Sequence, residues 1–213
     1  MAASGDRRPI ASRDTPWAKA FAARLAASGV TPNQVSQASM AAAALAGGAF
    51  WFAGETGGFG RAALLVLAAL GCQLRLLCNL FDGMIALEGG KAGPDGPFWN
   101  EFPDRVADLL ILAGVGLGTG EPALGFAAAA LAIFTAYVRE LGRAVGAPGD
   151  FSGPMAKQHR MAVVTAAALA SLLEPLFGAH GAVLTVALWV VAIGSALTVV
   201  RRSARLVGHL KAR

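Results

Sequence analysis

Six long stretches dominated by apolar side chains constrain this chain more than any other feature. They cover residues 32–53, 61–87, 103–117, 122–145, 157–177 and 181–200. An α-helix rises about 1.5 Å per residue, so roughly 20 residues cross a hydrocarbon core of about 30 Å. Charged residues make up only 15% of the chain, against about 25% in soluble domains. We therefore expect an all-α integral membrane protein with six transmembrane helices, the third of them short.

A separate amphipathic helix is expected before the first span, over residues 15–28. Its apolar residues Trp17, Phe21 and Leu25 follow one another at four-residue spacing, and Lys19 and Arg24 lie elsewhere around the helix. This pattern is typical of an interfacial helix on the cytoplasmic leaflet.

The start of the first span and the limits of the membrane domain can also be predicted. Thr31 is placed to cap a helix whose first residue is Pro32. The first 30 residues lack an apolar core with a cleavage site, so we expect no secretory signal and a retained first span. We predict an N-terminal tail over residues 1–14, one membrane domain over residues 15–200, and a basic cytoplasmic tail over residues 201–213.

The basic residues indicate the orientation of the chain. All 18 Lys and Arg residues except Arg61 and Arg75 fall on one side of the six-span arrangement. By the positive-inside rule, both termini and the acidic loop face the cytoplasm of a multi-pass protein in the cytoplasmic (inner) membrane. The net charge of +5 then favours contact with anionic membrane lipids, and no pattern points to a nucleic acid partner.

Two further patterns are interpreted as packing. Cys72 and Cys78 lie six residues apart on one predicted helix and form no CxxC pair, so we expect small apolar residues there. The glycine-rich run at 114–120 follows a membrane helix and no strand, which argues against a nucleotide-binding loop.

The acidic residues are concentrated near the predicted cytoplasmic end of the second span. Six of the 13 lie between residues 78 and 108. On the second span, three- and four-residue steps place four residues on one helical face: Asn79, Asp82, Gly83 and Ala86. Arg75 lies one turn deeper on that face, and a charge at this depth requires a partner.

The third span begins with further carboxylates. Pro103 suits a first helical position, and Glu101, Asp104 and Asp108 follow one another at steps of three and four residues. Two helix ends would thus present carboxylates at one depth, where like charges repel. Oxygen ligands select hard ions such as Mg²⁺ or Mn²⁺, which typically work on phosphates. The alternative is a set of carboxylates solvated at the membrane rim.

The stretch "NLFDGMIAL…NEFPDRVAD" resembles the motif of the CDP-alcohol phosphatidyltransferase family, DxxDGxxAR followed by GxxxDxxxD, and "GVTPNQVS" is similar to its TPN segment. The resemblance covers about residues 15–200. It implies that Asp82, Asp104 and Asp108 hold one or two Mg²⁺ or Mn²⁺ ions against the diphosphate of a CDP-lipid. Asp108 would be the catalytic general base for a small alcohol, and Asn79, Asp82, Gly83 and Ala86 would bind CDP. The resemblance also implies a homodimer.

The motif departs from the family pattern at three positions. Asn79 replaces the first aspartate, Leu87 replaces the arginine, and Asn100 replaces a glycine. The amide oxygen of Asn79 is still a metal ligand candidate, and Glu101 is placed on the right face to restore the missing charge. Glu101 can equally be an ordinary residue at a helix N-terminus.

A basic loop precedes the fifth span. "GPMAKQHR" resembles the GxxxRxxR of family branches whose acceptor alcohol carries a phosphate, with Gly153, Lys157 and Arg160 matching. Cations at a helix start are poorly placed for the helix dipole, so an anion is expected nearby. Arg139, at the end of span four, is a further candidate for phosphate or acceptor binding. These cations can alternatively serve only membrane topology, and His159 is interpreted as a polar loop residue.

The sequence therefore predicts a transferase that moves a phosphatidyl group from a CDP-lipid such as CDP-diacylglycerol to a small alcohol, with release of CMP. A polyol or a polyol phosphate is the preferred acceptor. The first alternative is a relative that binds lipid or nucleotide without turnover, because Asn79 and Leu87 depart from the motif. A divalent-cation transporter is a weaker alternative, because the carboxylates lie at the membrane rim.

Overall fold

A computed structural model describes residues 15–88 and 93–212, and within these ranges all regular structure is helical. The elements are α1 (Pro16–Ala27), α2 (Pro32–Glu55), α3 (Gly58–Glu88), α4 (Gly96–Gly118), α5 (Pro122–Ala144), α6 (Lys157–Ala170), the short 3-10 helix η2 (Ser171–Phe177) and α7 (Ala182–Lys211). The predicted tail at residues 1–14 lies outside the described residues.

Four helical segments are long and apolar enough to cross a membrane: Gly58–Ala86, Pro122–Ala144, Lys157–Phe177 and Ala182–Lys211. The predicted class of all-helical membrane protein is thus supported, whereas hydropathy identifies four spans instead of six. The two predicted spans that do not qualify are α2, which is rich in Ala and Gly, and α4, which carries Asp104, Arg105 and Asp108. Both are covered by neighbouring helices, since α2 packs extensively against α3 and α4.

Several predicted boundaries are confirmed. The helix expected at residues 15–28 is present as α1, and α2 begins at Pro32 with a complete capping box between Thr31 and Gln34. The fifth predicted span begins at Lys157 as expected, but it is α-helical only to Ala170 and continues as η2, because the ring of Pro175 conflicts with the carbonyl of residue 171 in a continuing α-helix.

One boundary prediction is wrong, and the last helix is longer than the predicted span. Helix α4 starts at Gly96, with Pro97 in its first turn, so Pro103 lies inside the helix and removes one backbone hydrogen bond there. Helix α7 continues to Lys211 through the segment predicted to be a tail. Helix-forming residues fill that segment, and its one glycine, Gly208, does not end the helix.

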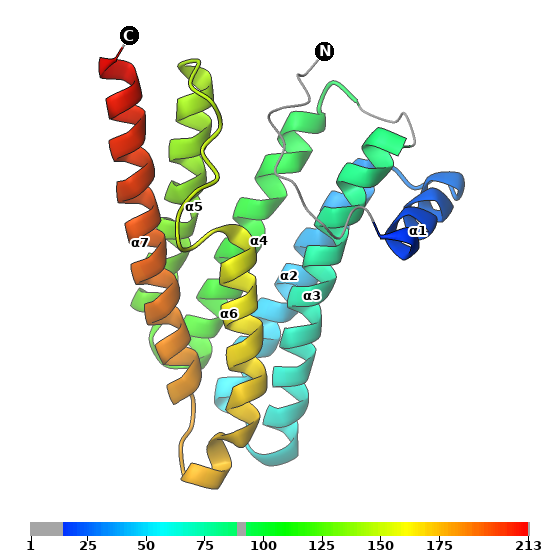
Figure 1. Cartoon of the computed structure of the whole chain (residues 1–213). Helices are drawn as coiled ribbons and strands as arrows, with labels where there is room; N and C mark the ends of the chain where they lie inside the picture. The colour runs from blue at the N-terminus through cyan, green and yellow to red at the C-terminus, as the bar shows by residue number, and fades with distance from the viewer. Residues whose placement is uncertain (1–14, 89–92, 213) are drawn as a thin grey trace.

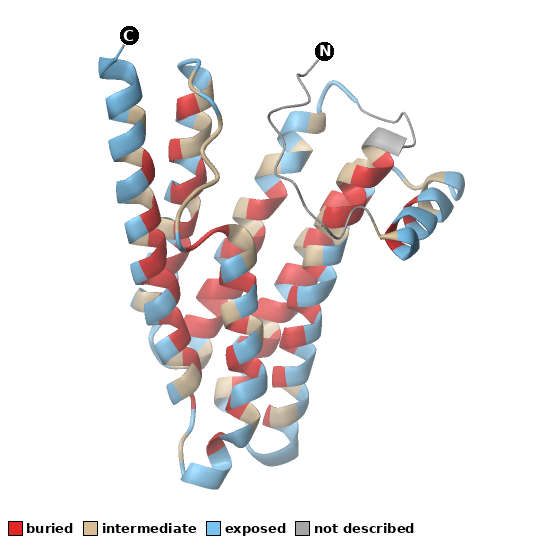
Figure 2. Cartoon of the chain, viewed as in Figure 1, coloured by how far each residue is buried: buried red, intermediate tan, exposed pale blue. Residues whose placement is uncertain are grey.

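The helices form a bundle in which α1 and the last turns of α7 lie toward the same end, and α1 lies across the end of α3 (Figure 1). Helix α5 packs on α4 and α7, and α6 packs on α3 and α7. Buried residues face the bundle interior, while the outer faces are largely exposed (Figure 2). Those outer faces carry large apolar side chains such as Phe126, Trp189 and Leu197, as expected for surfaces in contact with lipid.

Glycines allow α2 and α4 to approach closely. A Cβ added to Gly47 would lie 2.3 Å from the carbonyl oxygen of Leu110, and one added to Gly114 would lie 2.2 Å from that of Gly47. The glycine-rich run at 114–120 therefore serves helix packing, as the sequence indicated.

We predict that Gly47→Ala lowers the thermal stability of the protein in detergent strongly, because the added methyl group forces α2 and α4 apart. Gly48→Ala is the matched control on the same helix, since a Cβ there meets no atom within 4 Å, and it should leave the melting temperature unchanged or slightly raised. Equal melting temperatures for the two variants would contradict the close packing of α2 and α4.

A buried ion pair joins α3 to η2, and its carboxylate also contacts the start of α7. Arg61 Nη2 donates to Glu174 Oε2 at 2.6 Å, and both side chains are almost fully buried. The carboxylate of Glu174 also accepts from the backbone N–H groups of Gly181, at 2.9 Å, and Val183, at 2.7 Å. Glu174 therefore satisfies donors at the start of α7 that would otherwise lack a partner.

Candidate functional site

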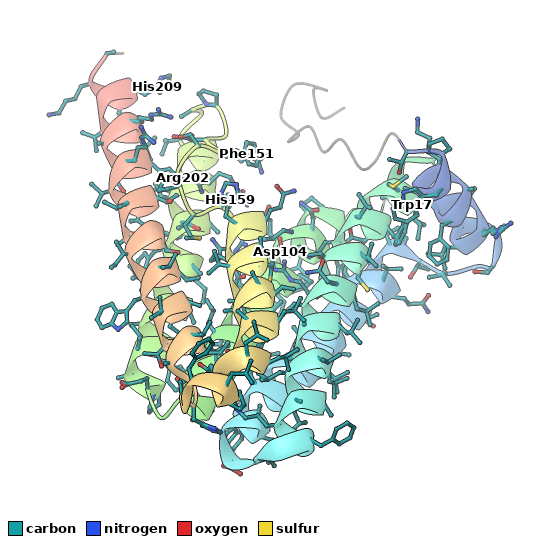
Figure 3. The ribbon with its side chains drawn as sticks, turned by 60° about the horizontal axis from the view of Figure 1, so that its bottom comes forward. Trp17, Asp104, Phe151, His159, Arg202 and His209 are labelled. Atoms are coloured by element: carbon teal, nitrogen blue, oxygen red, sulfur yellow. The ribbon has the colours of Figure 1, made fainter. Side chains whose placement is uncertain are left out.

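Three predicted aspartates lie on α3 and α4 in the half of the bundle on which α1 packs, and Figure 3 labels one of them, Asp104. Asp82 comes from α3, and Asp104 and Asp108 come from successive turns of α4. The exposed fractions are 7% for Asp82 and Asp104 and 0% for Asp108. Asp82 Oδ2 accepts a hydrogen bond of 2.8 Å from Ser36 Oγ of α2. We call these three residues the aspartate cluster.

Three cations contact the aspartate cluster. Arg75 Nη2 lies 3.2 Å from Asp104 Oδ1 and 3.8 Å from Asp108 Oδ1. Lys157 Nζ donates to Asp104 Oδ2 at 2.6 Å, and Arg160 Nη2 donates to Asp108 Oδ2 at 2.5 Å. These contacts confirm the prediction that Arg75 has a partner. The physical reason is that a buried guanidinium without a counter-charge is costly.

The loop before α6 brings Lys157 and Arg160 to the cluster. Gly153 has φ of +125°, and a Cβ there would lie 2.5 Å from the side chain of Thr198. The Oγ1 atom of Thr198 accepts a hydrogen bond from Met155 N at 3.0 Å, which fixes the loop against α7. Gly153 is thus needed for a close backbone approach, and α6 then begins at Lys157.

The aspartate cluster offers oxygen atoms, which are the ligands that a hard divalent ion such as Mg²⁺ prefers. All its donors are carboxylate oxygens, and Asp108 Oδ1 is buried without a hydrogen-bond partner among the described residues. No group of three His, Cys, Asp or Glu side chains in residues 15–88 and 93–212 is arranged to hold an ion as it stands. In this arrangement Arg75, Lys157 and Arg160 engage the carboxylates of Asp104 and Asp108.

The other predicted metal and CDP residues lie close to these on the same helices. Asn79, Gly83 and Ala86 are half-buried on α3, and Asn79 Nδ2 has no partner among the described residues. Glu101 is engaged away from the aspartates, in ion pairs with Arg105 of its own helix and, at 2.5 Å, with Arg139 of α5. Glu101 therefore positions Arg139 in this structure.

A second feature, which we call the basic pocket, lies between α5, α7 and the loop at residues 145–156. It has a volume of about 340 Å³, and its polar lining consists of Arg139, Asp150, Arg202, Arg205 and His209. The guanidinium of Arg139 also lies 5.2 Å from the ring centre of Phe151. The residues predicted to bind phosphate therefore lie at two places. Arg139 lines the basic pocket, whereas Lys157 and Arg160 contact the aspartate cluster.

Arg202 and Arg205 were not predicted as site residues. Arg202 is buried and donates to the carbonyl oxygens of Ser152 and Thr135, at 2.9 and 2.6 Å. Arg205 donates to Ser152 Oγ at 2.5 Å and lies 3.6 Å from Asp150. Their three-residue spacing places both side chains on one face of a helix, which could have indicated a shared site. We did not use this spacing, because all basic residues after the last span were attributed to membrane topology.

Asp150 gives the basic pocket a fixed negative charge. Burial by itself raises the pKa of Asp150, but hydrogen bonds from Ser152 and the nearby charges of Arg205 and Arg202 outweigh that effect and hold the pKa below its usual range. The carboxylate therefore stays ionised at neutral pH and keeps Arg205 at the pocket.

An apolar groove of about 550 Å³ runs between α1, α2 and α3. Trp17 and Phe21 of α1 contact Phe81 of α3, with ring centres 6.1 and 4.8 Å apart. Phe81 immediately precedes Asp82, so the groove reaches the neighbourhood of the aspartate cluster.

No family model matches the chain. Curated proteins do resemble it. Over 192 residues it is 29% identical to phosphatidylinositol phosphate synthase of Streptomyces avermitilis, a match that covers 85% of this chain and 74% of that protein. Over 164 residues it is 33% identical to the bifunctional IPC transferase and DIPP synthase of Rubrobacter xylanophilus, covering 73% of this chain and 33% of that protein. The chain thus spans about a third of the bifunctional relative.

Solved structures share the fold. The phosphatidylinositol phosphate synthase of Mycobacterium tuberculosis with CDP-DAG bound matches with a TM-score of 0.74 at 20% identity, over 90% of this chain and 94% of that chain. The same synthase in complex with manganese and citrate matches with a TM-score of 0.73, over 89% and 88% of the two chains.

The fold and the site define a class of helical membrane proteins that carry an aspartate cluster at one end of a bundle. Within that class, the motif at residues 79–108 and the two curated relatives point to one family. The chain resembles the CDP-alcohol phosphatidyltransferases in sequence, and it shares the fold of a phosphatidylinositol phosphate synthase.

Proposed function

We propose that the protein transfers a phosphatidyl group from a CDP-lipid, such as CDP-diacylglycerol, to a small alcohol and releases CMP. The observation that supports this most is the convergence of Asp82, Asp104 and Asp108 beside Lys157 and Arg160. The relatives named above include a synthase whose structure holds CDP-DAG. The apolar groove beside Phe81 is suited to an acyl chain of such a lipid.

The reaction needs a base for the incoming alcohol. We assign this role to Asp108, whose Oδ1 atom has no hydrogen-bond partner among the described residues while Oδ2 is held by Arg160. The alcohol oxygen attacks the phosphorus on the lipid side as its proton passes to Asp108, and the bond from that phosphorus to CMP breaks. Arg160 then keeps the carboxylate in a fixed orientation.

A divalent ion belongs to this proposal. Asp82, Asp104 and Asp108 would hold Mg²⁺ or Mn²⁺, with the amide oxygen of Asn79 as a further ligand. Bound there, the ion would neutralise the diphosphate and stabilise the charge that develops on the leaving CMP. Asp82, Gly83, Ala86 and Asn79 share a face of α3 on which the CDP group can lie.

The basic pocket supports an acceptor that carries a phosphate. Arg139, Arg202 and Arg205 come together there with His209, and guanidinium groups bind phosphate with paired hydrogen bonds. A polyol phosphate therefore fits the pocket better than an uncharged polyol.

We predict that Arg205→Gln raises the KM for a phosphorylated acceptor about ten-fold, because one charge-assisted hydrogen bond to the phosphate is lost. The KM for CDP-diacylglycerol should not change. Arg201→Gln is the matched control, since Arg201 lies on the same helix and does not line the pocket. If the two variants had the same acceptor KM, the pocket would not be the acceptor site.

The basic residues support a topology with six spans, in which α2 and α4 cross the membrane in contact with α3. Both termini, the aspartate cluster and the basic pocket would then face the cytoplasm at the inner membrane, with α1 on the cytoplasmic leaflet. Cysteine accessibility to a membrane-impermeant reagent at the two ends of α4 would test the span that hydropathy does not identify.

The function can be tested with purified protein in detergent. Radiolabelled CDP-diacylglycerol, Mn²⁺ or Mg²⁺ and a panel of polyols and polyol phosphates should give CMP release that depends on both metal and acceptor. If CDP-lipid bound without CMP release for any acceptor, the protein would be a binding relative without turnover.

A further inference from the structure

The aspartate cluster has as many positive as negative side chains around it, and this balance governs how a divalent ion enters. Two of its three carboxylates, those of Asp104 and Asp108, contact three basic side chains, which are Arg75, Lys157 and Arg160. Lys157 is also within electrostatic range of Asp82. The cluster is therefore neutral as it stands, and a divalent ion added to it would create an excess of positive charge in a buried site.

The three cations differ in how readily they can leave. Arg75 and Arg160 are at most 1% exposed, and each is held by contacts at the inner side of the cluster. The side chain of Lys157 is 30% exposed. A lysine ammonium on a flexible four-carbon stem moves more easily to solvent than a buried guanidinium. Lys157 is thus the cation that can be withdrawn without unpacking the helices.

We propose that Lys157 is an exchangeable counter-ion, which neutralises Asp104 in the metal-free protein and yields the Oδ2 atom of Asp104 to a single divalent ion. This inference rests on the proposed function only in taking the aspartate cluster as the metal site. Arg75 contacts both Asp104 and Asp108, and in this proposal it keeps that place when the ion binds. The buried guanidinium of Arg75 thereby neutralises part of the carboxylate charge, a role that a second metal ion would otherwise have to fill.

The charges support a stoichiometry of one ion. Asn79 adds no negative charge, so the cluster has one net negative charge once Lys157 has withdrawn. One divalent ion then makes the cluster positive by one charge, which suits an anionic diphosphate, whereas a second ion would add two further positive charges to a buried site. The released Lys157 Nζ, on the accessible side of the cluster, is free to donate to a phosphate oxygen.

Titration of the full-length protein in detergent with Mn²⁺, followed by electron paramagnetic resonance without any substrate, tests this exchange. The wild type should bind one Mn²⁺ per chain. Lys157→Gln should bind it about ten-fold more tightly, because the competing cation is gone. Lys157→Arg keeps a positive charge and should bind no more tightly than the wild type. Lys211→Gln, which removes the same charge at the end of α7, should bind as the wild type does.

Equal or weaker Mn²⁺ binding by Lys157→Gln would overturn the exchange, as would two bound ions in the wild type or tighter binding by Lys211→Gln. CMP release is measured separately on the same preparations. Tighter Mn²⁺ binding without CMP release would support the exchange and count against the transferase. CMP release with unchanged Mn²⁺ affinity would overturn the exchange and leave the transferase standing.

Discussion

Asp108→Asn should reduce acceptor-dependent CMP release at least about 100-fold, because an amide cannot take the proton of the attacking alcohol. Loss of the base should lower kcat much more than it changes the KM for CDP-diacylglycerol. Steady-state kinetics with both substrates varied would measure this. The fold should persist, since Arg160 can still donate to the amide oxygen that replaces Oδ2.

Asp95→Asn is the matched control for this substitution. Asp95 lies at the start of the same helix and accepts from Asn33 Nδ2 at 2.8 Å and from Trp99 Nε1 at 2.9 Å, away from the aspartate cluster. It should retain CMP release close to that of the wild type. If Asp108→Asn released CMP as fast as Asp95→Asn does, Asp108 would not be the base.

Glu174→Ala should have the largest effect on stability, about 3–5 kcal/mol, because it leaves the buried guanidinium of Arg61 without a counter-charge. It also removes the acceptor for the backbone N–H groups of Gly181 and Val183. Thermal unfolding in detergent, with helical circular dichroism as the readout, would measure the loss.

A double variant separates these two causes. Arg61→Leu combined with Glu174→Leu removes the orphaned charge but still leaves α7 without its acceptor. We therefore expect it to recover most, but not all, of the stability lost in Glu174→Ala. A double variant no more stable than Glu174→Ala would mean that the ion pair contributes little and that the contact with α7 dominates.

The sequence predicted the aspartate cluster because the relevant signals are local. Helical spacing fixes which residues of one helix share a face, and the cost of burying Arg75 required a counter-charge. Both features are present, with Arg75 beside Asp104 and Asp108. The helix cap at Thr31 was predicted for the same reason.

The partners of the cations depend on packing between helices, which spacing along the chain does not determine. Lys157 and Arg160 were assigned to a phosphate, yet they contact Asp104 and Asp108 because α6 packs on α3 beside the start of α4. The basic pocket combines the end of α5 with the extension of α7, and that extension was predicted to be a tail. The roles of the individual site residues and a homodimer remain predictions.

The most direct measurement of the central claim is mass spectrometry of the lipids formed from CDP-diacylglycerol, Mn²⁺ and a polyol phosphate. Our account predicts one new lipid, in which the phosphatidyl group is joined to the acceptor, in an amount equal to the CMP released. Unchanged CDP-diacylglycerol, or phosphatidic acid formed by hydrolysis whether or not an acceptor is present, would contradict it.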